Sequence, residues 1–145
     1  METKQPKNCL ITRCVTPLRV RYAEVDQQGA LHHSRFAVYF EVGRTELLRQ
    51  NGFDYKAFEQ NGMVLVVAKL ECRFKSPARY DDELELTTTL ARIDRARLEH
   101  RFELFRPADS RLIALGSTTL VHVNAQGKLR PIPDIFYPGP DWKQP

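Results

Sequence analysis

Two carboxylates, a glycine and two adjacent histidines lie close together in one short stretch of the sequence. They are Glu24, Asp26, Gly29, His32 and His33, and they stand between a predicted strand and a predicted helix. A helix N-terminus presents unpaired N–H groups and a partial positive charge, so it polarises a carbonyl and stabilises a developing oxyanion. A carboxylate on the preceding loop could attack that carbonyl or deprotonate a water beside it. The stretch therefore indicates hydrolytic chemistry, with Asp26 as the reacting carboxylate.

The neighbouring polar residues have simpler interpretations. Strand alternation would put Glu24 on the same face as Asp26, where we interpret it as structural. His33 is interpreted as a helix-entry residue that lends its backbone N–H and orients substrate or water. His32 either contacts substrate or lies on the surface. Ser34 lacks the flanking glycines of a serine-hydrolase turn, so its ordinary role would be that of a helix N-cap.

A metal site is not predicted. His32 and His33 are adjacent, and His100 and His122 stand alone within strand patterns, so no pair has the i, i+4 spacing around a carboxylate that zinc sites use. The three cysteines include no CxxC pair and are odd in number, which argues against a disulfide framework. We expect a protein of a reducing compartment that needs no cofactor.

The elements that position these residues follow from hydrophobic periodicity. Apolar residues at spacings of three and four predict one long helix from Ser34 to about Asn51, and one further helical turn is possible within residues 53–62. Alternating residues predict a strand over Pro17–Tyr22 and four more, over residues 63–75, 82–93, 96–106 and 112–124. Short turn-rich connections favour antiparallel pairing. The pattern predicts an α+β fold in which a sheet curls around one helix.

The length and composition fit a single globular domain. The chain has 145 residues, of which 42% are hydrophobic and 28% charged, with a net charge of +4. We expect one body over residues 15–136, flanked by tails at residues 1–14 and 137–145. The charge is too small and too interspersed for a nucleic-acid binder. No apolar run is long enough for a signal peptide or a membrane span, so a cytoplasmic location is expected.

Taken together, these motifs resemble a known family. The spacing Asp26-x-x-Gly29-x-x-x-His33-x-x-Phe36, the helix segment from Tyr39 to Leu48, and the later segment from Pro77 to Asp82 look like the 4-hydroxybenzoyl-CoA thioesterase family of hotdog-fold acyl-CoA thioesterases. The resemblance runs from about Leu18 to Ile135. It implies a sheet of five or six antiparallel strands around a long central helix, a homodimer often paired into a tetramer, and metal-free hydrolysis of acyl-CoA.

The resemblance also implies roles for individual residues. The family's catalytic aspartate falls on Asp26, its motif glycine on Gly29, and the backbone N–H that contacts the thioester carbonyl falls near His33. Substrate contacts are expected from the helix start, and nucleotide contacts from the hairpin between the second and third of the four later strands. The residues in these two regions are His32, Ser34, Arg92, Arg95 and Arg97.

Several alternatives remain open at this stage. The three hairpin arginines could equally form a solvated turn with salt bridges to Asp94 and Glu99. Asp26 could act as nucleophile or as general base. The substrate carrier could be coenzyme A or an acyl-carrier protein, and a non-catalytic acyl-CoA-binding protein would use the same scaffold.

Overall fold

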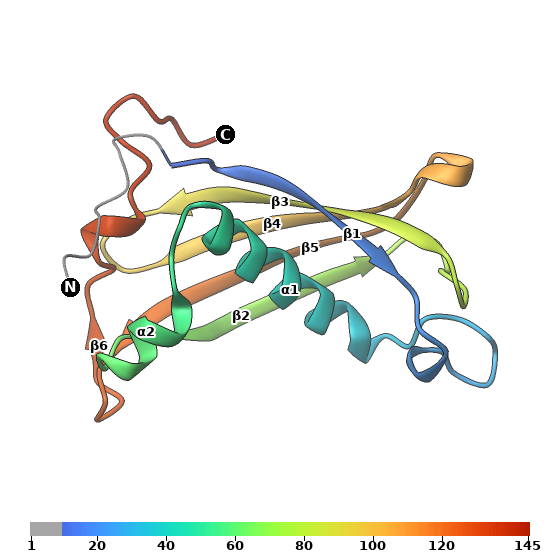
Figure 1. Cartoon of the computed structure of the whole chain (residues 1–145), viewed down its shortest axis with the longest axis horizontal. Coiled ribbons are helices and arrows are strands. Elements are labelled where there is room, and N and C mark those ends of the chain that lie inside the picture. Colours follow the sequence, from blue (N-terminus) through green and yellow to red (C-terminus); the bar gives the residue numbers. More distant parts are fainter. Residues whose placement is uncertain (1–9) are drawn as a thin grey trace.

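One long helix lies across one face of a six-stranded antiparallel sheet (Figure 1). The structure is a computed structural model that describes residues 10–145. The helices are α1 (Ser34–Gln50) and α2 (Tyr55–Gln60), and the strands are β1 (Arg13–Arg19), β2 (Val64–Phe74), β3 (Glu83–Ile93), β4 (Leu98–Arg106), β5 (Arg111–Val123) and β6 (Leu129–Arg130). Short 3-10 helices occur at Tyr22–Glu24, Pro107–Asp109 and Asp134–Phe136. The predicted α+β architecture, the long helix and the four long strands are confirmed.

The strands lie in the order β1-β3-β4-β5-β2, and β6 pairs with the C-terminal end of β5. Each of these pairings is antiparallel. The two long edge strands are therefore β1 and β2. Within the described residues, no helix is both long and apolar enough to cross a membrane.

The core forms where one side of α1 packs on the sheet. The buried side of α1 carries Phe36, Tyr39, Phe40, Gly43 and Leu47. Phe40 is fully buried and stacks on Phe102 of β4, with ring centroids 4.6 Å apart. This is the apolar stripe that the spacing of three and four predicts. Burying these aromatic rings fixes the direction of α1 across the sheet.

The body of the domain begins earlier than expected. β1 starts at Arg13, so the expected tail at residues 1–14 is too long by two residues. Cys14 is buried in this strand, with its sulfur 3.9 Å from the carbonyl oxygen of Gly43. Near the other end, Trp142, which lies in the expected tail at 137–145, packs against the core cluster that contains Phe136. Cys9 lies outside the described residues.

β2 differs from its predicted alternation. One apolar face was expected to be buried, but Leu65 is the only buried residue of the strand. Exposed fractions of 41–56% are found for Val66, Val67, Leu70 and Phe74. A register shift between Val67 and Lys69 interrupts the alternation, and β2 pairs with a neighbour on one side only. The strand therefore presents an apolar free edge.

Candidate active site at the start of helix α1

A tight loop connects the end of β1 to the start of α1. Isolated bridges pair Val25 with Leu31 and Ala30 with Arg79. The backbone N–H of Asp26 donates to the Ala30 carbonyl at 2.9 Å, and the N–H of Gly29 donates to the Asp26 carbonyl at 2.9 Å. Gly29 has a φ of +78°, a conformation that glycine adopts without strain. Asp26 is thus held opposite Ala30. Ala30 lies four residues before Ser34, the first residue of α1.

Half of the Asp26 carboxylate is used to hold this loop. Its Oδ1 accepts hydrogen bonds from the backbone N–H groups of Gln28, at 2.8 Å, and Ala30, at 3.3 Å. Its Oδ2 accepts no hydrogen bond from any residue between 10 and 145. One oxygen is therefore fixed by the backbone, and the other has a free lone pair for chemistry.

The backbone N–H groups at the helix start differ in their hydrogen-bond partners. Those of Leu31 and His32 donate to the carbonyls of Ala78 and Glu24, and that of Arg35 donates to the His32 carbonyl. The Ser34 N–H donates to Nδ1 of His32 at 3.2 Å. The N–H of His33 donates to none of the described residues. This N–H is the candidate oxyanion donor.

Glu24 has a structural role in the turn that follows β1. It belongs to the 3-10 turn at Tyr22–Glu24 and is 2% exposed. Its carboxylate accepts hydrogen bonds from the Arg21 N–H and the Tyr39 hydroxyl, each at 2.9 Å, and from the Arg21 guanidinium at 3.3 Å. Burial acts to raise the pKa of Glu24, but these hydrogen bonds together hold it below its usual value. The strand predicted over Pro17–Tyr22 ends at Arg19 instead, because the chain turns into this 3-10 helix.

His32 and Ser34 interact with each other at the helix entrance. The Ser34 hydroxyl lies 2.8 Å from Nδ1 of His32, and the His32 ring lies 4.1 Å from the His33 ring. Because Nδ1 accepts the Ser34 N–H, Nε2 carries the ring hydrogen in the neutral form. The N-cap residue of α1 is His33, and Ser34 is the first residue of the helix. The interpretation of Ser34 as the N-cap is therefore wrong by one position.

The three hairpin arginines lie at the other end of the sheet within one copy of the chain. Glu83 begins β3 beside Arg19, near the Asp26 loop, and Ile93 ends it near the hairpin. Ten strand steps separate these residues by about 33 Å. Arg92 and Arg97 form ion pairs with Asp94 at 2.9 and 3.5 Å, and Arg97 lies 3.6 Å from Glu99. The salt bridges of the alternative interpretation are therefore present.

Two arginines outside the hairpin lie against the Asp26 loop and on α1. Arg79 donates from Nη1 to the Gln28 carbonyl at 2.9 Å, which places it directly against the Asp26 loop. Arg44, on α1, is half-buried, and it belongs to the helix motif of the resemblance, which assigned it no role. Burial lowers the pKa of its guanidinium. Its spacing of four from the buried Phe40 was the signal that could have identified it, because this spacing puts both on one side of a helix.

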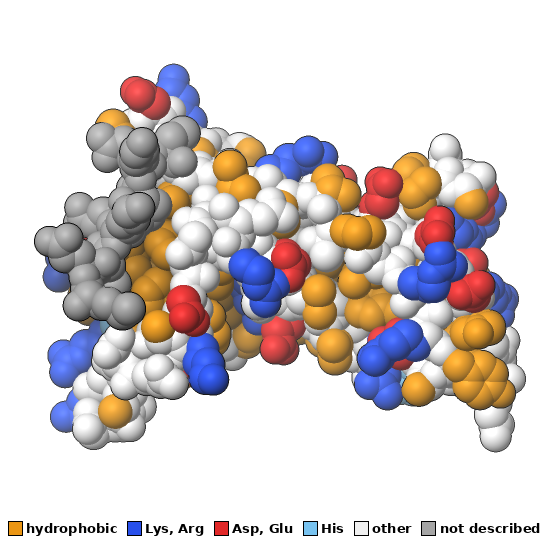
Figure 2. All heavy atoms as spheres, in the orientation of Figure 1, with side chains coloured by type: hydrophobic (Ala, Val, Ile, Leu, Met, Phe, Trp, Pro, Cys, Tyr) orange, Lys and Arg blue, Asp and Glu red, His pale blue; other side chains and the backbone are white. Residues whose placement is uncertain are grey.

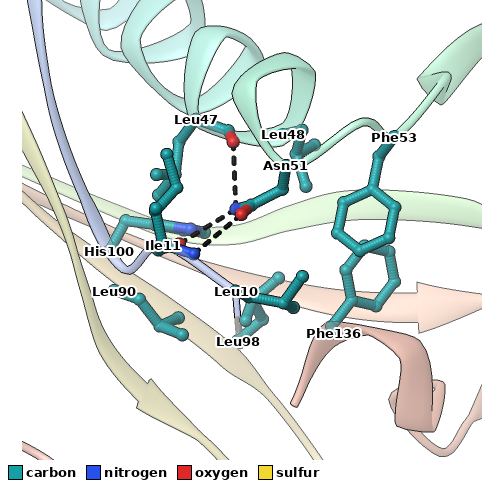
Figure 3. A pocket seen from close by; sticks show the side chains of 10 residues that line it. All are labelled: Leu10, Ile11, Leu47, Leu48, Asn51, Phe53, Leu90, Leu98, His100 and Phe136. Atoms are coloured by element: carbon teal, nitrogen blue, oxygen red, sulfur yellow. Dashed lines mark hydrogen bonds between the residues drawn. The ribbon is translucent and has the colours of Figure 1, made fainter. Parts of the chain in front are cut away.

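A small apolar cavity lies under the C-terminal end of α1 (Figure 3). It measures about 30 Å³, so it could hold one or two water molecules but no acyl group. The Asn51 side chain crosses it and donates to the Ile11 carbonyl at 2.9 Å and the Leu47 carbonyl at 3.1 Å. We regard this cavity as a packing feature. The described residues contain no group of three or more His, Cys, Asp or Glu side chains that could hold a metal ion.

Comparisons with known proteins agree with the fold. Residues 20–138 match the model of the thioesterase-like superfamily. Over 74 residues, the chain is 35% identical to the acyl-CoA thioester hydrolase YbgC of Escherichia coli, and the match covers 51% of this chain and 55% of that protein. The chain therefore spans only about half the length of this relative.

Solved structures resemble the chain over more of its length. A protein of Aquifex aeolicus is 32% identical with a TM-score of 0.78, over 83% of this chain and 93% of that one. The DHNA-CoA thioesterase of Staphylococcus aureus is 28% identical with a TM-score of 0.78, over 88% of this chain and 85% of that one. Their TM-scores show that this chain shares its fold with both.

Proposed function

This chain belongs to the thioesterase-like superfamily and has its hotdog fold, and from that premise we propose that it is an acyl-CoA thioesterase. The reaction would hydrolyse an acyl-CoA thioester to a free acid and coenzyme A. Its similarity to the acyl-CoA thioester hydrolase YbgC and to the DHNA-CoA thioesterase supports this activity. The resemblance of the motifs around Asp26 points to the same reaction.

One observation about the site carries the proposal. The free Oδ2 of Asp26 and the unpaired N–H of His33 belong to one short loop and helix start. The first is a base or nucleophile and the second is an oxyanion donor. Thioester hydrolysis needs both functions beside the same carbonyl.

The proposed mechanism assigns one step to each group. The His33 N–H and the positive end of α1 polarise the thioester carbonyl and stabilise the oxyanion. Asp26 either takes a proton from the attacking water or attacks the carbon itself, forming an anhydride that water then cleaves. The C–S bond breaks and the thiolate leaves with the electron pair. A thiol pKa of about 8.5 makes that thiolate tolerable without a strong general acid.

The working unit in this proposal is a homodimer formed through β2. The free edge of β2 carries exposed apolar residues, and on α1 the side chains of Val38 and Val42 are 43% and 37% exposed. Figure 2 shows apolar side chains grouped over the middle of α1, among isolated charges. A second copy would extend the sheet through β2 and cover this surface.

A two-fold axis reverses the second copy end for end. Its hairpin would then lie toward the end of the dimer that holds the Asp26 loop of the first copy. Arg92, Arg95 and Arg97 would be available to the nucleotide phosphates in this way, joined by Arg79 beside the loop.

The test is the variant Asp26→Asn. An asparagine Oδ1 can still accept the two backbone hydrogen bonds, so the loop keeps its shape while the base is lost. We expect kcat/KM for acyl-CoA substrates to fall by about 100-fold or more, measured by release of free thiol. Asp134→Asn, at an exposed aspartate outside the site, is the matched control. Unchanged turnover by Asp26→Asn would remove Asp26 from the mechanism.

A further inference from the structure

Arg44 of α1 lines a cleft between α1, α2 and β2. The cleft has a volume of about 270 Å³. Apolar residues of the sheet, including Leu65, Val67 and Leu120, form part of its wall, and Arg44 and Tyr55 add a cation and a phenol. The Tyr55 hydroxyl donates to the Leu65 carbonyl at 3.1 Å, which occupies its hydrogen. Arg44 is therefore the group in this cleft with donors to spare.

The Arg44 guanidinium is poorly satisfied for its burial. Its one hydrogen bond to a described residue goes from Nη1 to Thr118 Oγ1, and at 3.4 Å this bond is long. Glu41 and Glu59 also line the cleft, but within residues 10–145 no carboxylate oxygen lies within 4.0 Å of Arg44. A guanidinium has five N–H donors, so several lack partners. Leaving a half-buried charge unpaired is costly unless a ligand completes it.

We propose that this cleft receives the acyl group of a thioester, and that Arg44 selects acyl groups ending in a carboxylate. The inference rests on the proposed thioesterase function. The chemistry of the cleft fits such a group, because apolar walls suit a methylene chain and a guanidinium binds a carboxylate through two parallel N–H bonds.

The reacting carbonyl and the cleft belong to different copies of the chain in this proposal. Arg44 lies ten residues beyond Ser34, about 15 Å along α1, which is too far for a short acyl group bound at the helix start of the same copy. In a two-fold dimer through β2 the two α1 helices run in opposite directions. The second half of one α1, with Arg44, then lies beside the first half of the other. Each site would combine Asp26 of one copy with Arg44 of its partner.

The first experiment compares two substrates of similar chain length, glutaryl-CoA and hexanoyl-CoA. We expect wild-type protein to prefer glutaryl-CoA in kcat/KM. Arg44→Met should reduce that preference by about 100-fold, because the carboxylate loses its charged partner. Arg44→Lys should retain part of the preference, and Arg49→Met, at an exposed arginine of the same helix, should retain all of it.

The outcomes separate this inference from the proposed function. Absence of hydrolysis with every acyl-CoA contradicts the thioesterase function itself. Hydrolysis with no preference for glutaryl-CoA, or an equal loss on both substrates in Arg44→Met, overturns the role of Arg44 and leaves the thioesterase function intact.

The second experiment tests whether the site is shared. Asp26→Asn and Arg44→Met chains carrying different tags are co-expressed, and mixed dimers are purified through both tags. If the site combines residues of two copies, each mixed dimer has one intact site of two and should show about half of the wild-type activity on glutaryl-CoA. If Asp26 and Arg44 act within one copy, the mixed dimers will be as inactive as their parents, and the shared site is disproved. Failure to recover mixed dimers would also contradict it.

Discussion

At the residue scale, the polar side chains beneath α1 include one ionisable group that the proposed mechanism does not use. His100 on β4 is 3% exposed, and its Nδ1 has no hydrogen-bond partner among the described residues. It lines the small cavity beneath the end of α1 (Figure 3). Burial, and secondly the charge of Arg44, lower its pKa to about 3. The imidazole therefore stays neutral in the native protein at ordinary pH.

This neutral histidine predicts a pH dependence of stability. The unfolded chain binds a proton at His100 below about pH 6.5, whereas the native state does so only near pH 3. The unfolded state thus binds more protons across this window, and the free energy of unfolding should fall by up to about 1.4 kcal/mol for each pH unit lost. Urea titrations between pH 6.5 and 4.5 would measure this slope. In the His100→Leu variant, the free energy of unfolding should fall less steeply with decreasing pH, by about that amount. Identical slopes for the variant and the wild type would show that His100 does not contribute.

At the scale of elements, the distance between α1 and the sheet depends on glycine. A Cβ built on Gly116 of β5 would lie 2.3 Å from two ring atoms of Phe40 and 3.2 Å from the backbone oxygen of Glu71. These separations are well inside van der Waals contact. Phe40 is fully buried against Phe102, so its ring has little space to move.

Gly116→Ala should therefore destabilise the protein by about 1–3 kcal/mol, because the added methyl group overpacks the core. The measurement is the midpoint and slope of urea unfolding. Adding Phe40→Leu, which shortens the opposing side chain, should make the double variant less destabilised than the sum of the two single variants. Simple additivity would contradict the proposed clash.

The same elements illustrate what the sequence could and could not predict. Period-two and period-3.6 patterns located α1 and four strands to within a few residues, because apolar residues recur along each of them at the spacing of a helix or a strand. The loop from Asp26 to His33 was predicted as a candidate site, because a carboxylate just before a helix N-terminus can take part in hydrolysis. The exposure of β2 and the placement of Arg44 were missed, since both depend on which strand lies at the sheet edge. Strand order is a tertiary property that local periodicity does not encode.

At the scale of the whole molecule, the surface formed by α1 and β2 links the fold to the proposed chemistry. One copy leaves apolar side chains of both elements exposed along the edge of the sheet. The proposed site needs that same surface, because it combines the Asp26 loop of one copy with the Arg44 cleft of the other. Assembly and activity should therefore be lost together.

Val42→Glu tests this connection. Val42 is 37% exposed on α1, so a glutamate there can remain solvated in a single copy, but it would place two like charges near the two-fold axis of the proposed dimer. We expect sedimentation to report monomers and hydrolysis of glutaryl-CoA to fall by about 100-fold, since each Asp26 loses the partner's Arg44. Val15→Glu, at a valine of the opposite edge strand β1 that is 44% exposed, should remain dimeric and active. A fully active Val42→Glu monomer would show that a single copy holds the complete site.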